Sequence, residues 1–77
     1  MVNPRDIQEQ MEVKGSDGGH IGTVDHLDGD RIKLTRSDPA SGGEHHYLAL
    51  DMVDEIRGGA VCMTATAEQC RQSWSTV

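Results

Sequence analysis

The apolar positions of this chain predict short β-strands that double back on one another. Two turn signals, Ser-Asp-Gly-Gly at 16–19 and Asp-Gly-Asp at 28–30, flank short apolar segments. Three strands, at 11–14, 20–28 and 31–36, must therefore reverse direction within a short stretch of chain. This pattern indicates a small all-β domain of the meander type.

The second of these segments departs from the strict alternation of a strand. Ile21, Val24 and Leu27 recur at every third residue, and a regular strand cannot place all three on one face. A bulge or sharp bend at Gly22 removes the conflict and supplies the curvature that a small closed barrel requires. The third segment alternates regularly, with Ile32 and Leu34 inward and Arg31, Lys33 and Thr35 outward.

The second half of the chain continues the strand pattern. Turn-forming residues fill a loop at 37–43. A fourth strand is expected at 45–50, with Leu48 and Leu50 inward, and a last strand at 60–63. The chain should therefore form a small β-barrel of five or six short strands.

Two short helical segments accompany these strands. Asn3 can cap an N-terminal helical turn that runs to Gln10 and places Ile7 and Met11 on one face. Residues 51–56 indicate a second helical turn, which places Val53 and Ile56, three residues apart, under the barrel.

The C-terminal segment begins like a helix. Thr66 is an N-cap residue, and Gln69 stands three positions later, as in a capping box. The helix should occupy 67–75, and it contains the single tryptophan, Trp74. A large aromatic residue near the end of a chain either closes the mouth of the barrel or anchors an interface.

The composition fits one domain with a lean core. The chain has 77 residues, 35% of them apolar, and contains no phenylalanine. A chain of this length has no room for a second core, so residues 1–77 should form a single domain with its barrel core at 11–66. Small domains of this kind often gain the missing burial by self-association or by docking on a partner.

The acidic charge changes the list of expected partners. The formal charge is −6, from seven Lys and Arg against thirteen Asp and Glu. Nucleic acids and anionic membranes attract clustered positive charge, so we expect neither as a partner. Residues 1–6 lack the apolar region of a secretion signal, and no apolar run is long enough for membrane insertion. We expect a cytoplasmic protein in which Cys62 and Cys70 are free thiols.

Three basic residues form a short stripe on this acidic chain: Arg31, Lys33 and Arg36. The stripe fits a docking surface for an acidic partner, a contact with RNA phosphates, or an ordinary solvated strand face. No aromatic residues are interleaved with it to stack on bases, which weighs against RNA. Together with Trp74, these are the partner-binding residues that the sequence predicts.

The four histidines raise the question of a metal site. A barrel could bring His26 near the adjacent pair His45 and His46, and histidine is the commonest transition-metal ligand. Adjacent strand residues point to opposite faces, however, so the pair cannot reach one ion without a bulge. We expect surface or rim histidines satisfied by hydrogen bonds, and a metal- or small-ligand-sensing barrel is the alternative.

The sequence contains no pattern that implies catalysis. Asp25, Asp28 and Asp30 do not follow the calcium-binding loop of an EF-hand, and the glycine-rich turns lack the strand-to-helix context of a phosphate loop. Serine, histidine and aspartate are present at no spacing that implies a nucleophile and its base. We therefore expect no enzymatic activity and no cofactor.

Several segments taken together resemble the PRC-barrel superfamily. They are Met-Glu-Val at 11–13, Gly-Ser-Asp-Gly at 15–18, His-Ile-Gly-Thr-Val-Asp at 20–25, Asp-Arg-Ile-Lys-Leu at 30–34 and His-Tyr-Leu-Ala-Leu-Asp-Met-Val at 46–53. The likeness is closest to a bacterial branch of short, stand-alone proteins of unknown function. One departure is Ala49, where many relatives carry proline.

The resemblance implies a PRC-like barrel that docks onto a larger assembly, as such barrels do in the photosynthetic reaction centre and in a ribosome maturation factor. It carries no catalytic residue onto this chain. The expected function is therefore a non-enzymatic docking module that presents its strand edges and the loop at 37–43 to a protein partner or to a second copy of itself. The alternatives are the histidine-based sensor and an RNA- or ribosome-associated factor.

Overall fold

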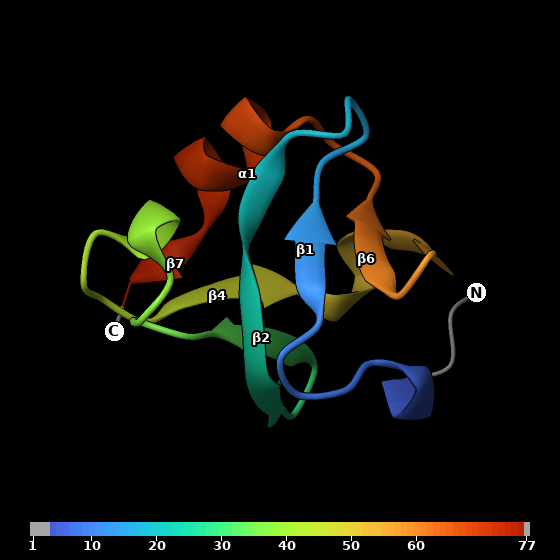
Figure 1. Ribbon diagram of the computed structural model, residues 1–77, viewed down its shortest axis with the longest axis horizontal. Helices are drawn as coiled ribbons and strands as arrows, with labels where there is room; N and C mark the ends of the chain where they lie inside the picture. Colours follow the sequence, from blue (N-terminus) through green and yellow to red (C-terminus); the bar gives the residue numbers. More distant parts are fainter. Residues whose placement is uncertain (1–3, 77) are drawn as a thin grey trace.

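The computed structural model describes residues 4–76 and shows one mixed β-sheet with a C-terminal α-helix (Figure 1). Six strands of three to nine residues form the sheet, and a two-residue seventh extends it. The strands are β1 (Glu12–Lys14), β2 (His20–Asp28), β3 (Arg31–Leu34), β4 (His46–Ala49), β5 (Val53–Arg57), β6 (Ala60–Met63) and β7 (Ser75–Thr76). The prediction of a small, mostly β fold with a C-terminal helix is confirmed.

The sheet is open, so the predicted closed barrel is wrong. The strand order is β5-β6-β1-β2-β3-β4-β7, and within residues 4–76 no ladder joins β5 to β7. β1 and β6 are parallel, whereas all other neighbours are antiparallel. Closure fails because the 3₁₀ turn η3 (Leu50–Met52) carries the chain away from β4, and β5 then pairs with β6.

Two irregularities bend β2. The register slips at Ile21 in the pairing with β1 and at Asp25 in the pairing with β3. These bulges lie on either side of Gly22, so β2 bends as predicted, but not at Gly22 itself. They allow Ile21 and Val24 to be fully buried together. Gly22 lies close to Leu34: a Cβ atom at Gly22 would be 3.1 Å from Leu34 Cδ1, so the Leu34 side chain would have to shift.

The core is built from aliphatic side chains of β1, β2, β3, β4, β6 and the helix. Ile32, Leu34 and Leu48 are buried as predicted, and Leu50 packs against the core from η3. Thr35 is also buried, although the alternation predicted that it points outward. β3 ends at Leu34, and the Thr35 N–H instead donates to the Thr23 carbonyl at 2.8 Å.

The prediction of a helical turn over 51–56 is mostly wrong. A single 3₁₀ turn ends at Met52, and the chain continues as β5. Val53 and Ile56, spaced by three, both pack against the core because the register with β6 slips at Asp54. A bulged strand thus produces the spacing that was interpreted as helical.

The N-terminal helical segment is shorter than predicted. It consists of the 3₁₀ turn η1 (Pro4–Asp6), and the predicted cap Asn3 lies outside the described residues. Gln10 has a φ of 71°, which is incompatible with a helix running to that residue. Ile7 is nevertheless buried and Met11 half-buried, so both face the core as expected.

The C-terminal helix α1 (Ala67–Ser73) begins with the predicted capping box. The Gln69 N–H donates to Thr66 Oγ1 at 3.2 Å, and the Thr66 N–H donates to Gln69 Oε1 at 3.0 Å. The helix stops before residue 75 because Trp74 is extended and leads into β7. No helix in the described part of the chain is long and apolar enough to cross a membrane.

The glycine-rich turn between β1 and β2 packs against the start of α1 (Figure 1). A Cβ atom on Gly15 would lie 2.2 Å from the Ala67 backbone nitrogen, so only glycine allows this approach. Asp17 Oδ1 accepts hydrogen bonds from the N–H groups of Gly19 and Ala67 at 3.1 and 3.2 Å. These bonds lower the pKa of the Asp17 carboxyl. The turn therefore has a structural role at the start of the helix.

Candidate functional site

The outer edge of β5 is an unpaired strand edge. The sheet ends on one side at β5 and on the other at the two-residue β7, and among residues 4–76 only β6 pairs with β5. Such an edge offers its backbone N–H and C=O groups to another strand. It is therefore the first candidate for a binding surface.

The turn after β5 determines which backbone groups point outward. Gly58 and Gly59 have φ values of 59° and 76°, as a two-residue type I′ turn requires. Arg57 and Ala60 flank this turn and form the hydrogen-bonded pair that closes the hairpin. Because bonded and non-bonded pairs alternate, the N–H and C=O of Ile56 point to the free edge.

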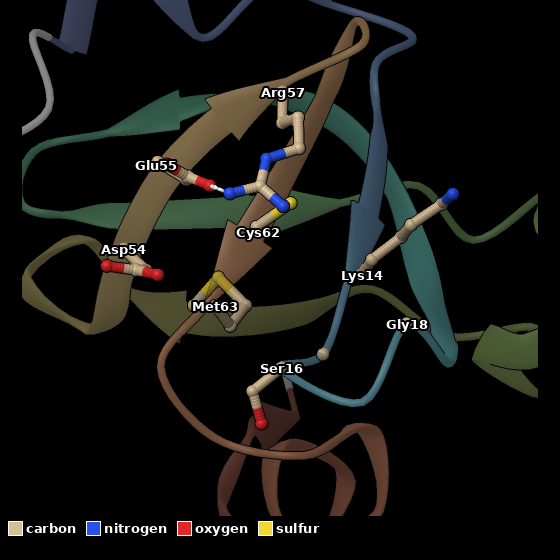
Figure 2. A pocket seen from close by; sticks show the side chains of 9 residues that line it. Lys14, Ser16, Gly18, Asp54, Glu55, Arg57, Cys62 and Met63 are labelled. Carbon is tan, nitrogen blue, oxygen red and sulfur yellow. Dashed lines mark ion pairs between the residues drawn. The ribbon is translucent and has the colours of Figure 1, made fainter.

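Two opposite charges flank Ile56 on the outer face of β5. The Arg57 guanidinium forms an ion pair with the Glu55 carboxylate (Figure 2). The Arg57 side chain is 78% exposed and that of Glu55 42%, so both remain accessible to a partner. Ile56 lies on the other face and packs against the core.

An open pocket of about 330 Å³ lies between β5 and β1, over the intervening strand β6. Figure 2 shows Glu55 and Arg57 on one side of it and Lys14 on the other, with Cys62 between them. Its wall also includes Gly15, Ser16, Gly18, Asp54 and Met63. Because the lining combines both signs of charge with glycine backbone, it suits the polar side chains of a polypeptide better than an anionic cofactor.

A second polar cluster is centred on His20. Its Nδ1 lies 2.8 Å from Glu12 Oε2, and its Nε2 lies 2.8 Å from Asp38 Oδ2. Thr23 Oγ1 donates a further hydrogen bond to Asp38 Oδ2 at 2.7 Å. A neutral imidazole has only one N–H, so both carboxylates are satisfied only when His20 is protonated.

The surroundings of this cluster shift two pKa values. The hydrogen bond with Glu12 is the largest cause that raises the pKa of His20, with a further contribution from Asp38. Burial alone would raise the pKa of Asp38, but hydrogen bonds from Thr23, the Ala40 N–H and His20 outweigh it and lower that pKa. The cluster holds the 3₁₀ turn η2 (Pro39–Ser41) against β2 through a charged link.

The structure brings together two of the three predicted basic residues. Arg31 and Lys33 share the outer face of β3, where the Arg31 guanidinium lies 4.3 Å from the Tyr47 ring centroid. Arg31 also pairs with Asp28 at 3.2 Å. Arg36 lies beyond the end of β3, so it does not continue this stripe.

Trp74 and His46 form one aromatic pair. Their rings stack with centroids 3.8 Å apart and an angle of 6° between the planes. His46 is buried, contrary to the expectation of a surface or rim position, and its Nε2 lies 2.7 Å from the Ser41 carbonyl oxygen. Trp74 packs against the core, although the open sheet has no barrel mouth for it to close.

The three histidines considered as metal ligands do not meet. His26 and His45 lie near Asp25, with Nδ1 atoms 3.5 and 3.9 Å from its Oδ2, whereas His46 faces the core. His45 Nδ1 also lies 3.0 Å from the Leu34 carbonyl oxygen. Within residues 4–76, no three His, Cys, Asp or Glu side chains are grouped as a metal site.

Comparison with known protein families matches residues 7–71 to DUF2171, described as an uncharacterised protein conserved in bacteria. The chain belongs to this family. The match begins at the buried Ile7 and ends within α1, so the family covers the β5 edge and the His20 cluster. The resemblance to a bacterial family of unknown function is confirmed. Neither the curated proteins nor the solved structures include a match to the chain.

The sequence pattern predicted strand edges in general as a docking surface, but it predicted neither the strand β5 nor the His20 cluster. The available signal for β5 was the pair of β-branched residues Val53 and Ile56 before the Gly-Gly turn. The predicted hairpin of the first two strands could have suggested a contact between Glu12 and His20. Asp38 comes from a loop whose path follows no periodic pattern.

Proposed function

We propose that this protein is a non-enzymatic docking module that binds an extended segment of a protein partner along the outer edge of β5. The observation that carries the proposal is the open sheet, in which β5 has a strand partner on one side only among residues 4–76. In strand addition, such an edge supplies main-chain hydrogen bonds, and a neighbouring pocket receives side chains.

The proposal includes membership of the PRC-barrel superfamily and a cytoplasmic location. The segments at 20–25 and 46–53 that resemble PRC barrels fall on β2 and on β4 with η3. The docking roles of such barrels support docking here. Cys62 and Cys70 are both free, as suits a reducing compartment.

Two substitutions at Ile56 test the proposal. Ile56→Ala and Ile56→Pro both remove most of a half-buried side chain, but only proline also removes the outward N–H, and an edge strand tolerates proline at such a position. We expect wild type and Ile56→Ala to retain the same proteins from a bacterial lysate and Ile56→Pro to lose them. Thermal melts followed by circular dichroism check that both variants fold.

Retention of the same proteins by Ile56→Pro at the wild-type level would contradict binding along this edge. If Ile56→Ala and Ile56→Pro both fail to retain these proteins, the binding depends on the Ile56 side chain and not on its N–H. That result would also contradict strand addition.

A further inference from the structure

We infer that a second copy of this chain occupies the β5 edge, with the two β5 strands antiparallel across a two-fold axis at Ile56. This rests on the proposed function, because it names the occupant of the same edge. The inference follows from the direction of the backbone groups and from the order of charges along β5.

The backbone restricts the possible registers. In a continuous antiparallel sheet, residues directly opposite each other share a face, and the outward backbone groups of the two strands must meet. The outward groups of β5 belong to Ile56, as the type I′ turn at Gly58 and Gly59 requires. A two-fold axis at Ile56 therefore lets the two Ile56 residues exchange both N–H···O=C bonds.

The charges select this register over its neighbour. With the axis at Ile56, Glu55 of each copy lies opposite Arg57 of the other, in non-hydrogen-bonded positions where side chains approach most closely. A shift by two residues would instead place Glu55 against Glu55. Opposite charges directly across a sheet stabilise the pairing, and like charges destabilise it.

The expected dimer is weak. Three residue pairs form a contact far smaller than the roughly 1,200–2,000 Å² of stable interfaces. Association should therefore increase with protein concentration and decrease with salt, since the cross-strand charges are exposed. The Glu55–Arg57 ion pair within one chain becomes part of a four-charge cluster across the axis.

Charge reversal tests both the dimer and its register. Glu55→Arg places Arg against Arg, and Arg57→Glu places Glu against Glu, so each single variant should dimerise on the order of tenfold more weakly than wild type. The double variant restores opposite charges and should dimerise like wild type. An equimolar mixture of the two single variants should form a heterodimer. Sedimentation velocity over a range of concentrations at low salt measures all five samples, wild type included.

Two results would overturn the inference. One is a wild-type protein that remains monomeric at every concentration. The other is a double variant that associates as weakly as the single variants, because the axis at Ile56 requires the double variant to regain wild-type association. Glu55 and Arg57 are exposed and contribute little to the core, so we expect the single variants to fold. Thermal melts check this.

The two proposals fail separately. A monomeric wild-type protein that still captures proteins through the Ile56 N–H would overturn the second copy and support the docking function. The opposite result is a concentration-dependent dimer that follows the charge pattern while no other protein is captured. That result would support the second copy and contradict binding of a different protein at this edge.

Discussion

His20 is the residue whose contacts depend most directly on proton concentration. Its two ring nitrogens face carboxylate oxygens of Glu12 and Asp38, each at 2.8 Å. The imidazolium satisfies both carboxylates, whereas the neutral ring leaves one of them facing a nitrogen lone pair. The charge of this one side chain therefore controls how firmly the η2 turn is held to β2.

We predict that the stabilisation supplied by His20 decreases as the pH rises. The folded-state pKa of His20 lies above its ordinary value of 6.5, so the contribution is complete below pH 6.5 and is lost as the pH passes the folded-state pKa. Asp38 behaves oppositely: its pKa is lowered, so its contribution is lost as the pH falls from 3.8 through the folded-state pKa.

Urea denaturation of wild type and His20→Gln between about pH 5 and pH 9 measures the effect. The difference in the free energy of unfolding between the two proteins should be largest at the acidic end. Parallel curves across this range would contradict the assignment of the bridge to the imidazolium.

At the scale of elements, regular strands were predictable, whereas only one of the two bulged strands was. The alternation of Ile32 and Leu34 identifies β3 because a two-residue period has one structural meaning. A three-residue period has two meanings, a bulged strand or a helical turn. It was interpreted correctly for β2 and wrongly for Val53 and Ile56, because only the pairing with β6 distinguishes the two structures.

The contact between the β1–β2 turn and α1 leads to a prediction at the same scale. We expect Gly15→Ala to lower the free energy of unfolding by about 3 kcal/mol, because the new Cβ would lie 2.2 Å from a backbone nitrogen of α1. Gly18→Ala is the matched control: its Cβ meets nothing within 4 Å, but its φ is 82°. That backbone conformation costs alanine about 1 kcal/mol. Equal losses in urea denaturation would argue against close contact at Gly15.

At the scale of the whole molecule, the sheet depends on pairings between distant parts of the sequence. The parallel ladder of β1 with β6 and the short pairing of β4 with β7 follow from no local pattern, so the sequence predicted a closed meander where the structure is open. The sequence left two roles open for Trp74, closure of a barrel mouth or an interface, and in the structure Trp74 packs against the core.

The packing of Trp74 predicts a loss of stability when it is truncated. Trp74→Ala removes the stack on His46 and a partly buried side chain, so we expect the free energy of unfolding to fall by about 2–3 kcal/mol. Trp74→Phe keeps a ring over His46 and should lose about half as much. Chemical denaturation followed by circular dichroism compares the variants. Unchanged stability in Trp74→Ala would indicate that the residue serves an interface instead.

The parallel ladder between β1 and β6 also determines the order in which the chain can fold. The β2–β3–β4 meander and the β5–β6 hairpin join neighbours in sequence, whereas the ladder brings Glu12 beside Ala60. Closing so long a loop is entropically costly and slows folding. During translation, one edge of β1 therefore stays unpaired until β6 has left the ribosome, and β1 gains its second neighbour only then.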